Sequence, residues 1–441
     1  MINKIRNVIN ENKTLFSDMF LVTSATVISS FLSYYLNFYV QSKFVDVTDF
    51  ANFSLFITFI SLISLLPNTL STSIIMTVTE LKSQNKFEEL YDLLKKLFAI
   101  FVLISAVIFL TAYKFESNLN SIFNVDIPNF FFYAGIYLFI LILTVPISAF
   151  IYGIMKFKTY SSILIGVVAT KIIGFGYFYS HGFGFNSIFY AFILSSLFAI
   201  VFGFISLNSD LEKPKIKISS RKLINKVFLF SLPLLLISFG RDMVTYIDFL
   251  VVKSKLSDVI SGNYSLLINI GKIFLFGSLI VLGVMLPQIA DSYNKKENYF
   301  NKFKIYLYLE LLIVLCGILF FGLFPRYVID FLIFFSNLIG LNASSFASYY
   351  NIVDYLPYYS FFISLVVLIN LFTIFLIAVQ KFYIFIVYIL TIIGQFLGIY
   401  FYGSDILNVI FCNIISASCL LIFLIYATFK QYENFNHNSS I

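Results

Sequence analysis

The sequence predicts an all-α polytopic membrane protein with twelve transmembrane helices, and three observations support this. Of the 441 residues, 60% are hydrophobic and only 12% are charged, which is more apolar surface than a water-soluble domain can bury. Apolar runs of about 20 residues, the length that crosses the hydrocarbon core as a helix, recur along the whole chain. Lysine and arginine gather in every second connector between these runs, as in multi-pass proteins.

Windows of apolar residues and the polar breaks between them define the individual spans. The twelve spans are predicted at 19–41, 52–78, 97–113, 130–152, 160–180, 187–207, 226–252, 263–289, 305–324, 357–379, 382–402 and 406–428. The segment Val328–Leu341 is apolar but too short to cross a bilayer, so it is predicted to be an interfacial helix. The first apolar run is longer than the core of a signal peptide, and we interpret it as an uncleaved first helix.

The distribution of basic residues predicts the orientation. With the N-terminus inside, the cytoplasmic segments contain 21 of the 29 lysines and arginines, and the outer segments contain five. Because basic residues are retained on the cytoplasmic side, both termini are predicted to be cytoplasmic. The same distribution explains the net charge of +7 without nucleic acid as a partner, and instead indicates contact with membrane lipids.

A basic connector divides the chain into two halves of six spans each. The predicted domains are an N-terminal lobe at 1–207, a cytoplasmic linker at 208–225 and a C-terminal lobe with a polar tail at 226–441. Shifting the second half back by 211 positions places Asn263–Ile268 on Asn52–Ile57. Six spans per repeat insert with the same orientation, so the sequence predicts two six-helix bundles related by a pseudo-twofold axis along the membrane normal.

Five charged residues fall deep within the predicted spans, where charge is costly. Lys171 lies in the fifth span, Arg241, Asp242 and Asp248 in the seventh, and Lys272 in the eighth. A helix rises about 1.5 Å per residue, which places the three cations roughly 13 to 16 Å from the outer ends of their spans, near the midplane. Asp242 shares this depth and Asp248 lies closer to the outer face.

Two interpretations of these charges remain open. In the first, Asp242 pairs with Lys272 and Asp248 offsets Arg241, which leaves a structural network without a ligand. In the second, which we favour, Lys171, Arg241 and Lys272 line a wet cavity that binds an anionic group such as a diphosphate. Asp242 and Asp248 are then the candidates for ion coupling, because desolvated carboxylates can exchange protons during transport.

The sequence contains no signature of an enzyme, so no catalytic residue is predicted. It has no phosphate loop ending in Gly-Lys-Ser/Thr and no His/Cys metal spacing, and neither a metal nor a cofactor is expected. Cys316, Cys412 and Cys419 lie inside apolar spans and are interpreted as small packing residues. Glu310 lies about one and a half turns into the ninth predicted span, and we interpret it as an acid that reaches the cytoplasmic interface.

Two outer turns resemble a known family. The segment Phe44–Leu55 (FVDVTDFANFSL) resembles the first-hairpin signature of Wzx-type polysaccharide flippases, and Ser257–Ser265 (SDVISGNYS) is similar to the signature in their second half. Ser231-Leu232-Pro233 at the start of the seventh span and Asp248 near its end also resemble that family. Ala51 replaces the glycine that is usual there.

The resemblance implies a fold and a function. The fold is that of the multidrug and oligosaccharidyl-lipid exporter superfamily (MATE-like), with two six-helix bundles around a central cavity. The implied substrate is an undecaprenyl-diphosphate-linked glycan, moved from the inner to the outer leaflet of the bacterial inner membrane by ion-coupled alternating access. The implied partners are a polysaccharide polymerase and the chain-length machinery. Lys171, Arg241 and Lys272 are assigned to the diphosphate by their depth, not by a family motif.

Three alternatives remain. A multidrug/cation antiporter of the same superfamily is the first, and the absence of a clearly buried acid in the first six spans argues against it. A peptidoglycan-precursor flippase is the second, although that family resembles a layout of fourteen spans. A membrane scaffold without transport activity is the third, and it would need no charged layer at the midplane.

Overall fold

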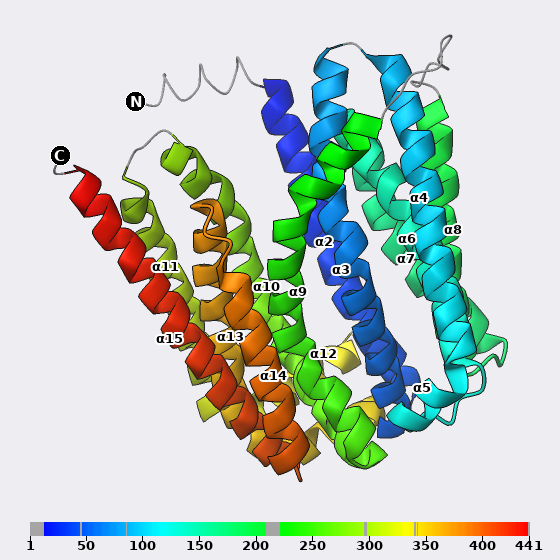
Figure 1. Cartoon of the computed structure of the whole chain (residues 1–441). Helices are drawn as coiled ribbons and strands as arrows, with labels where there is room; N and C mark the ends of the chain where they lie inside the picture. The colour runs from blue at the N-terminus through cyan, green and yellow to red at the C-terminus, as the bar shows by residue number, and fades with distance from the viewer. Residues whose placement is uncertain are drawn as a thin grey trace. The chain divides into compact units, whose positions relative to one another are not determined.

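Helices account for the regular structure of this chain. The computed structural model describes residues 13–44, 46–84, 86–208, 221–294, 298–338, 341 and 343–439, and within these ranges no strand occurs (Figure 1). Each predicted span coincides with a described helix. The all-helical, twelve-span prediction is therefore confirmed.

The first six spans are α2 (Lys13–Lys43), α3 (Val47–Ser83), α4 (Phe87–Lys114), α6 (Phe130–Gly153), α7 (Phe157–Ser180) and α8 (Asn186–Asn208). The other six are α9 (Arg221–Lys255), α10 (Asp258–Asn294), α11 (Tyr299–Gly317) with the π-helical η1 (Ile318–Leu323), α13 (Leu356–Ala378), α14 (Ile384–Tyr402) and α15 (Ile406–Ser439). Three shorter elements are α5 (Glu116–Phe123), α12 (Pro325–Leu338) and the 3₁₀ segment η2 (Ala343–Tyr355). Among the described residues, nine helices are long and apolar enough to cross a membrane, and α2, α9 and α10 match the remaining three predicted spans.

Contacts divide the chain into two compact units. Unit 1 comprises Met1–Gln41, Ile63–Ser121 and Val125–Leu235, and unit 2 comprises Ser42–Leu62, Ile122–Asn124 and Leu236–Ile441. Helices α3 and α9 therefore each contribute residues to both units. The predicted lobe boundaries at 207 and 226 stay a prediction, and most of the predicted linker 208–225 lies outside the described residues.

Unit 1 is built on the packing of α4, α6, α7 and α8, which run side by side in Figure 1. Its core contains fully buried aliphatic and aromatic side chains from several helices, including Ile74, Leu97 and Phe150. Helices α7 and α8 approach closely at Gly174, where an added Cβ would lie 3.3 Å from the Cα of Ala191. Small residues at such crossings bring membrane helices together, because close van der Waals packing drives their association.

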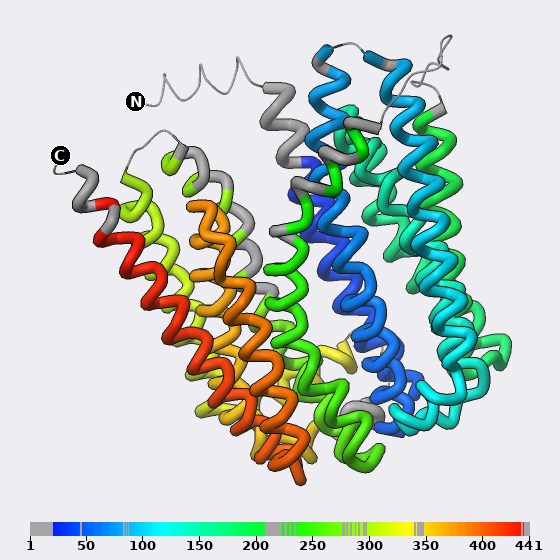
Figure 2. Tube along the Cα trace, viewed as in Figure 1, coloured from blue at the N-terminus to red at the C-terminus, as the bar shows by residue number. Residues whose placement is uncertain are grey.

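Unit 2 is organised around α13. In its most apolar stretch 72% of the residues are buried, against 17% in the span formed by α11 and η1. Helix α13 packs against α10, α11 and α15, and the tube in Figure 2 shows α13 and α15 passing close to each other. Helix α11 therefore presents most of its surface to lipid, and any polar side chain on its inner face is surrounded by α10 and α13.

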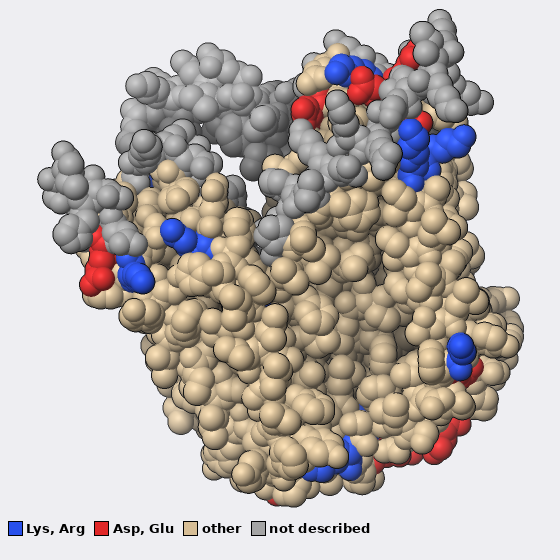
Figure 3. Space-filling model, in the orientation of Figure 1, with Lys and Arg blue, Asp and Glu red and all other residues tan. Residues whose placement is uncertain are grey.

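The surface charge agrees with a membrane setting. On the face shown in Figure 3, coloured lysine, arginine, aspartate and glutamate side chains lie towards the ends of the helices, and the wide area between them is almost entirely uncharged. An uncharged band between polar rims is what a bilayer requires, because water is absent at that depth.

Two glycines of unit 2 give a matched test of helix packing. A Cβ at Gly262 would lie 2.3 Å from a methyl group of Val47 and 2.6 Å from its backbone oxygen, whereas nothing lies within 4 Å of one at Gly394. We expect Gly262→Ala to destabilise the protein by about 1–3 kcal/mol through overpacking. Gly394→Ala should leave stability unchanged or slightly raised, because alanine favours the helix. Thermal unfolding of both variants in detergent measures this, and equal melting temperatures would contradict the described α3–α10 contact.

Candidate functional site

Lys171 on α7 lies in an aromatic environment inside unit 1. Its ammonium group lies 4.3 Å from the ring centre of Phe192 on α8 and 5.9 Å from that of Tyr137 on α6. The negative faces of aromatic rings attract a cation at these distances. No ion pair to Lys171 occurs among the described residues. The charge is therefore held by two rings and has no acidic partner in the described part of the chain.

Arg241 pairs with its neighbour on α9. Its Nε donates to Oδ1 of Asp242 at 2.9 Å, and the two side chains are 33% and 25% exposed. The preceding residue, Gly240, packs so closely on α14 that an added Cβ would lie 2.5 Å from the Cβ of Tyr388. Arg241 is therefore fixed beside α14 with its charge largely compensated.

Lys272 on α10 has no such compensation. It is partly buried, and no hydrogen bond or ion pair to it occurs within the described ranges. It lies 14 residues after the start of α10, and Arg241 lies 14 residues before the end of α9. Both are thus about 21 Å along their helices from the α9–α10 turn. The pairing of Asp242 with Lys272, considered from the sequence, is wrong, because the carboxylate of Asp242 faces Arg241.

Asp248 lies at the centre of a buried hydrogen-bond network, and its side chain has no exposed surface. Its Oδ2 accepts from the hydroxyl of Tyr264 at 2.5 Å and from Nδ2 of Asn413 at 2.9 Å, and its Oδ1 accepts from the backbone N–H of Phe249 at 2.7 Å. The suggested offset between Asp248 and Arg241 is also wrong. Neutral donors surround this carboxylate, and it has no cation partner among the described residues.

The network around Asp248 joins four helices. Asn413 on α15 accepts through Oδ1 from Nε2 of Gln395 on α14 at 2.8 Å, and the same Nε2 lies 3.1 Å from the carbonyl oxygen of Val244 on α9. Tyr264 adds α10. Sequence reasoning missed Tyr264, Gln395 and Asn413, although Gln395 and Asn413 stand out as isolated amides in otherwise apolar spans.

Glu310 is the second fully buried carboxyl of unit 2, with 0% exposure. Its Oε1 accepts from the hydroxyl of Ser278 on α10 at 2.9 Å, while its Oε2 has no partner within the described part of the chain. The interpretation of Glu310 as an interfacial acid is wrong for two reasons. Helix α11 begins at Tyr299, earlier than predicted, which moves Glu310 about 16 Å into the helix. Its side chain also turns inward to α10.

Lys253 near the end of α9 holds a segment of the first half of the chain inside unit 2. Its side chain is completely buried, 2.6 Å from Oδ1 of Asp258 and 3.2 Å from the carbonyl oxygen of Asn124. Asn124 has a positive φ of 49°, a conformation that costs energy for most residues and that asparagine tolerates. The buried ammonium group therefore fixes the turn after α5 within unit 2.

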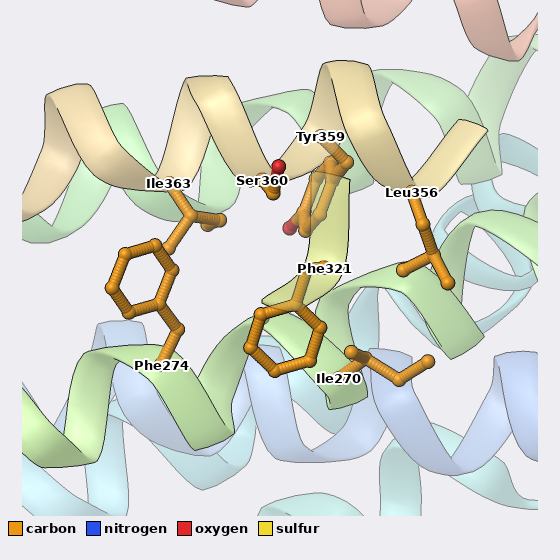
Figure 4. A pocket seen from close by; sticks show the side chains of 8 residues that line it. Ile270, Phe274, Phe321, Leu356, Tyr359, Ser360 and Ile363 are labelled. Atoms are coloured by element: carbon orange, nitrogen blue, oxygen red, sulfur yellow. The ribbon is translucent and has the colours of Figure 1, made fainter. Parts of the chain in front are cut away.

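Three cavities can be described from their lining residues. One of 220 Å³ in unit 1 is lined partly by the hydroxyl-bearing residues Ser29, Thr144, Ser148 and Tyr160. An apolar groove of 490 Å³ lies between α14 and α15 in unit 2. The third, between α10, η1 and α13, measures only 10 Å³ and is lined by the side chains in Figure 4, which leaves space for one water at most. None of the three has Lys171, Arg241 or Lys272 in its lining.

No group of three or more His, Cys, Asp or Glu side chains able to hold a metal occurs among the described residues. The three cysteines are free thiols. The candidate residues are therefore single charged groups, each described within its own unit, and most of them contact aromatic rings, hydroxyls or amides.

Comparison with known proteins identifies solved structures that have this architecture. No family model and no curated protein sequence matches the chain. Among solved structures, an inward-facing multidrug-resistance MATE family transporter of the MOP superfamily superimposes with a TM-score of 0.70 at 14% identity, over 89% of this chain and 93% of that one. The lipid II flippase MurJ in an inward closed conformation gives 0.67 at 16% identity, over 95% and 90%. A MOP superfamily transporter from Pyrococcus furiosus gives 0.62 at 13% identity, over 93% and 95%.

These likenesses define a multi-pass membrane protein with the fold of transporters and flippases. The fold is the one seen in MATE family transporters of the MOP superfamily and in MurJ. The MATE-like fold class is thereby confirmed, and the narrower Wzx-type assignment stays a prediction.

The Asp248 network predicts a graded loss of stability. Asp248→Ala leaves the buried hydroxyl of Tyr264 without its acceptor, which costs about 1–3 kcal/mol, whereas Nδ2 of Asn413 keeps the hydroxyl oxygen of Tyr264 at 2.9 Å. Asp248→Asn keeps an acceptor oxygen and should cost less. Asp354→Asn, at an exposed position, is the matched control. Thermal unfolding should rank wild type and Asp354→Asn first, Asp248→Asn next and Asp248→Ala last, and an unaffected alanine variant would contradict the network.

Proposed function

We propose that this protein is a flippase for lipid-linked oligosaccharides in the bacterial inner membrane. It translocates undecaprenyl-diphosphate-linked repeat units from the cytoplasmic to the outer leaflet for surface polysaccharide biosynthesis, by ion-coupled alternating access. The observation that carries the proposal is that Lys171 and Lys272, one in each half of the chain, lie within membrane helices without an acidic partner among the described residues.

An ammonium group without a carboxylate partner inside a membrane helix needs a physical reason, because a charge costs about 2.5–3.5 kcal/mol or more at the bilayer centre. Two such groups are explained if the ligand supplies the negative charge. A diphosphate offers several anionic oxygens, and its hydrogen bonds to ammonium groups are charge-assisted and therefore strong. Lys171 and Lys272 are assigned to this role.

Arg241 is also a candidate for binding the diphosphate, but only if its pairing with Asp242 allows it. Its guanidinium group already donates to Asp242, so it binds a diphosphate only if it releases that carboxylate or uses its remaining N–H groups. Asp242 and Asp248 are the proposed ion-coupling residues. Asp248 is the stronger of the two, because it is fully buried and surrounded by neutral donors that can rearrange when the carboxyl gains or loses a proton.

The structural relatives support the proposal at the level of their own descriptions. MurJ is described as a lipid II flippase, which shows that a fold of this kind can carry lipid-linked cargo. The Pyrococcus furiosus transporter is described as having a binding pocket of reverse polarity that suggests a different function. Pocket charge therefore varies among proteins with this fold, and unpaired lysines favour an anionic cargo.

A multidrug/cation antiporter of the same fold is the second candidate. It is favoured by the MATE family structures and by Asp248, a buried carboxylate that could bind a cationic drug or its coupling ion. The two candidates differ in the sign of the charge on the cargo. Substitution of the lysines should impair the flippase and leave the antiporter intact, whereas loss of Asp248 should impair both.

We expect Lys272→Gln and Lys171→Gln each to lower export of surface polysaccharide by about 10-fold or more, since a charge-assisted hydrogen bond contributes about 1.5–3 kcal/mol. Lys272→Arg should retain part of the activity because it keeps the charge. Lys430→Gln, at an exposed position near the C-terminus, is the control. The measurement is surface glycan per cell at matched membrane levels of each variant.

Wild-type export by both lysine variants would remove these residues from the mechanism. An unchanged glycan combined with altered resistance to cationic dyes would favour the antiporter.

A further inference from the structure

Glu310 is a buried carboxyl that the proposed function does not use. It lies near the middle of the membrane segment formed by α11 and η1, with no exposed surface. The rest of that segment is largely lipid-facing, so Glu310 is a polar group on the inner face of an apolar helix. Such residues are rare within membranes and mark functional sites.

The hydrogen bonding of Glu310 is incomplete. Oε1 accepts from Ser278, and Oε2 has no partner among the side chains that the structure describes. The α10 residues next to Ser278 whose side chains are not described are Phe276, Gly277, Leu279 and Ile280, and none of these residue types has a side-chain donor. An ionised carboxylate would therefore carry a bare oxygen in an apolar environment, which is costly.

No cation compensates Glu310 from the helices packed against it. On α10, the nearest ionisable residue towards the N-terminus is Lys272, six residues from Ser278 and thus about 9 Å along the axis, and the next towards the C-terminus is Asp291. Helix α13 offers only Tyr358 and Tyr359, and η1 offers none. On α11 itself, the other titratable groups are Tyr299, Lys302, Lys304, Tyr306, Tyr308 and Cys316, of which Tyr306 is one turn away.

The donor set suits a proton better than a metal ion. Glu310 and Ser278 together supply three side-chain oxygens, whereas hard cations such as Ca²⁺ and Mg²⁺ take six or more oxygen ligands. No cluster of metal-binding side chains occurs in the described chain. A proton on Oε2 needs no further ligand, because it neutralises the charge and leaves Oε1 to accept from Ser278.

The helix that carries Glu310 also changes its winding. Two turns after Glu310, α11 passes into the π-helical η1 at Gly317, whose Cα is covered by the ring of Phe274 on α10. Short π-helical stretches often occur at functional sites. Phe274 and Phe321 of η1 stack with ring centres 6.2 Å apart and line the small pocket in Figure 4. The contact between α10 and α11 therefore includes both the carboxyl and an irregular helical segment.

We propose that Glu310 is a proton-binding site that is loaded in the conformation described here and is emptied when α11 separates from α10 during the transport cycle. The protonated side chain keeps α11 against α10 through the Ser278 hydrogen bond. Once water reaches Oε2, the proton leaves and the carboxylate becomes solvated. The inference extends the proposed function by naming a coupling residue in addition to Asp248, and it rests on that function only for the link to transport.

Infrared spectroscopy of the purified full-length protein in lipid vesicles tests the site without any glycan. Wild type should show a carbonyl stretch of a protonated carboxylic acid that weakens as the pH rises. Glu310→Gln should lack this component, whereas Glu89→Gln, an acid paired with Lys86 at the start of α4, should retain it. Ser278→Ala should shift it to higher frequency, because the carbonyl oxygen loses its donor. Asp248→Asn should leave it in place.

Two results would overturn the proposal. The first is a wild-type spectrum without the carbonyl stretch of a protonated acid. A Glu310→Gln spectrum that still contains this stretch at full strength counts in the same way. The second is a component that stays constant over the whole pH range in which the protein remains folded, because a proton that never leaves cannot couple transport. The infrared measurement needs no substrate, so its result does not depend on whether the chain moves a lipid-linked glycan. The surface-glycan assay tests the flippase function independently.

Discussion

Every polar group that lies between the membrane surfaces has to find its partner within the protein, because hydrocarbon offers none. This constraint explains most of the side-chain arrangement described above. Asp248 draws donors from α10 and α15, Lys171 is held by two aromatic rings, and Lys253 is held by an aspartate and a backbone carbonyl. Each group links helices that apolar packing alone would leave free to rotate against one another.

Two polar groups within the membrane helices, Lys272 and Glu310, lack a full set of partners. Lys272 has no partner in the described chain and Glu310 has only half of its bonding satisfied. A protein under selection for stability alone would replace both with apolar residues, since removing an unpaired buried charge is favourable. Polar groups without a full set of partners inside a membrane protein are expected at positions where function requires them. The two incomplete sites lie on α10 and α11, which pack against each other in unit 2.

The sequence predicted the helices well because span length and hydropathy depend only on local composition. All twelve spans and the short helix near Val328 were found, whereas α11 began six residues early because its first turns mix aromatic and basic residues. The pairing of charges was predicted poorly. Asp248 and Asn413 are 165 residues apart, and their contact depends on how each helix is rotated, which hydropathy does not encode. Arg241 and Asp242, by contrast, are adjacent in the sequence, so their ion pair needs no long-range information.

Unit 2 combines segments that are far apart in the sequence, and this affects the order in which its contacts form during synthesis. Residues Ser42–Leu62 belong to this unit together with Leu236–Ile441, although the ribosome produces them about 170 or more residues earlier. Lys253 reaches back in the same way to a carbonyl 129 positions before it. The segment Ser42–Leu62 is synthesised early, but its contacts within unit 2 cannot form until the later helices have followed. Synthesis of this chain therefore passes through a stage in which this segment still lacks its neighbours in unit 2.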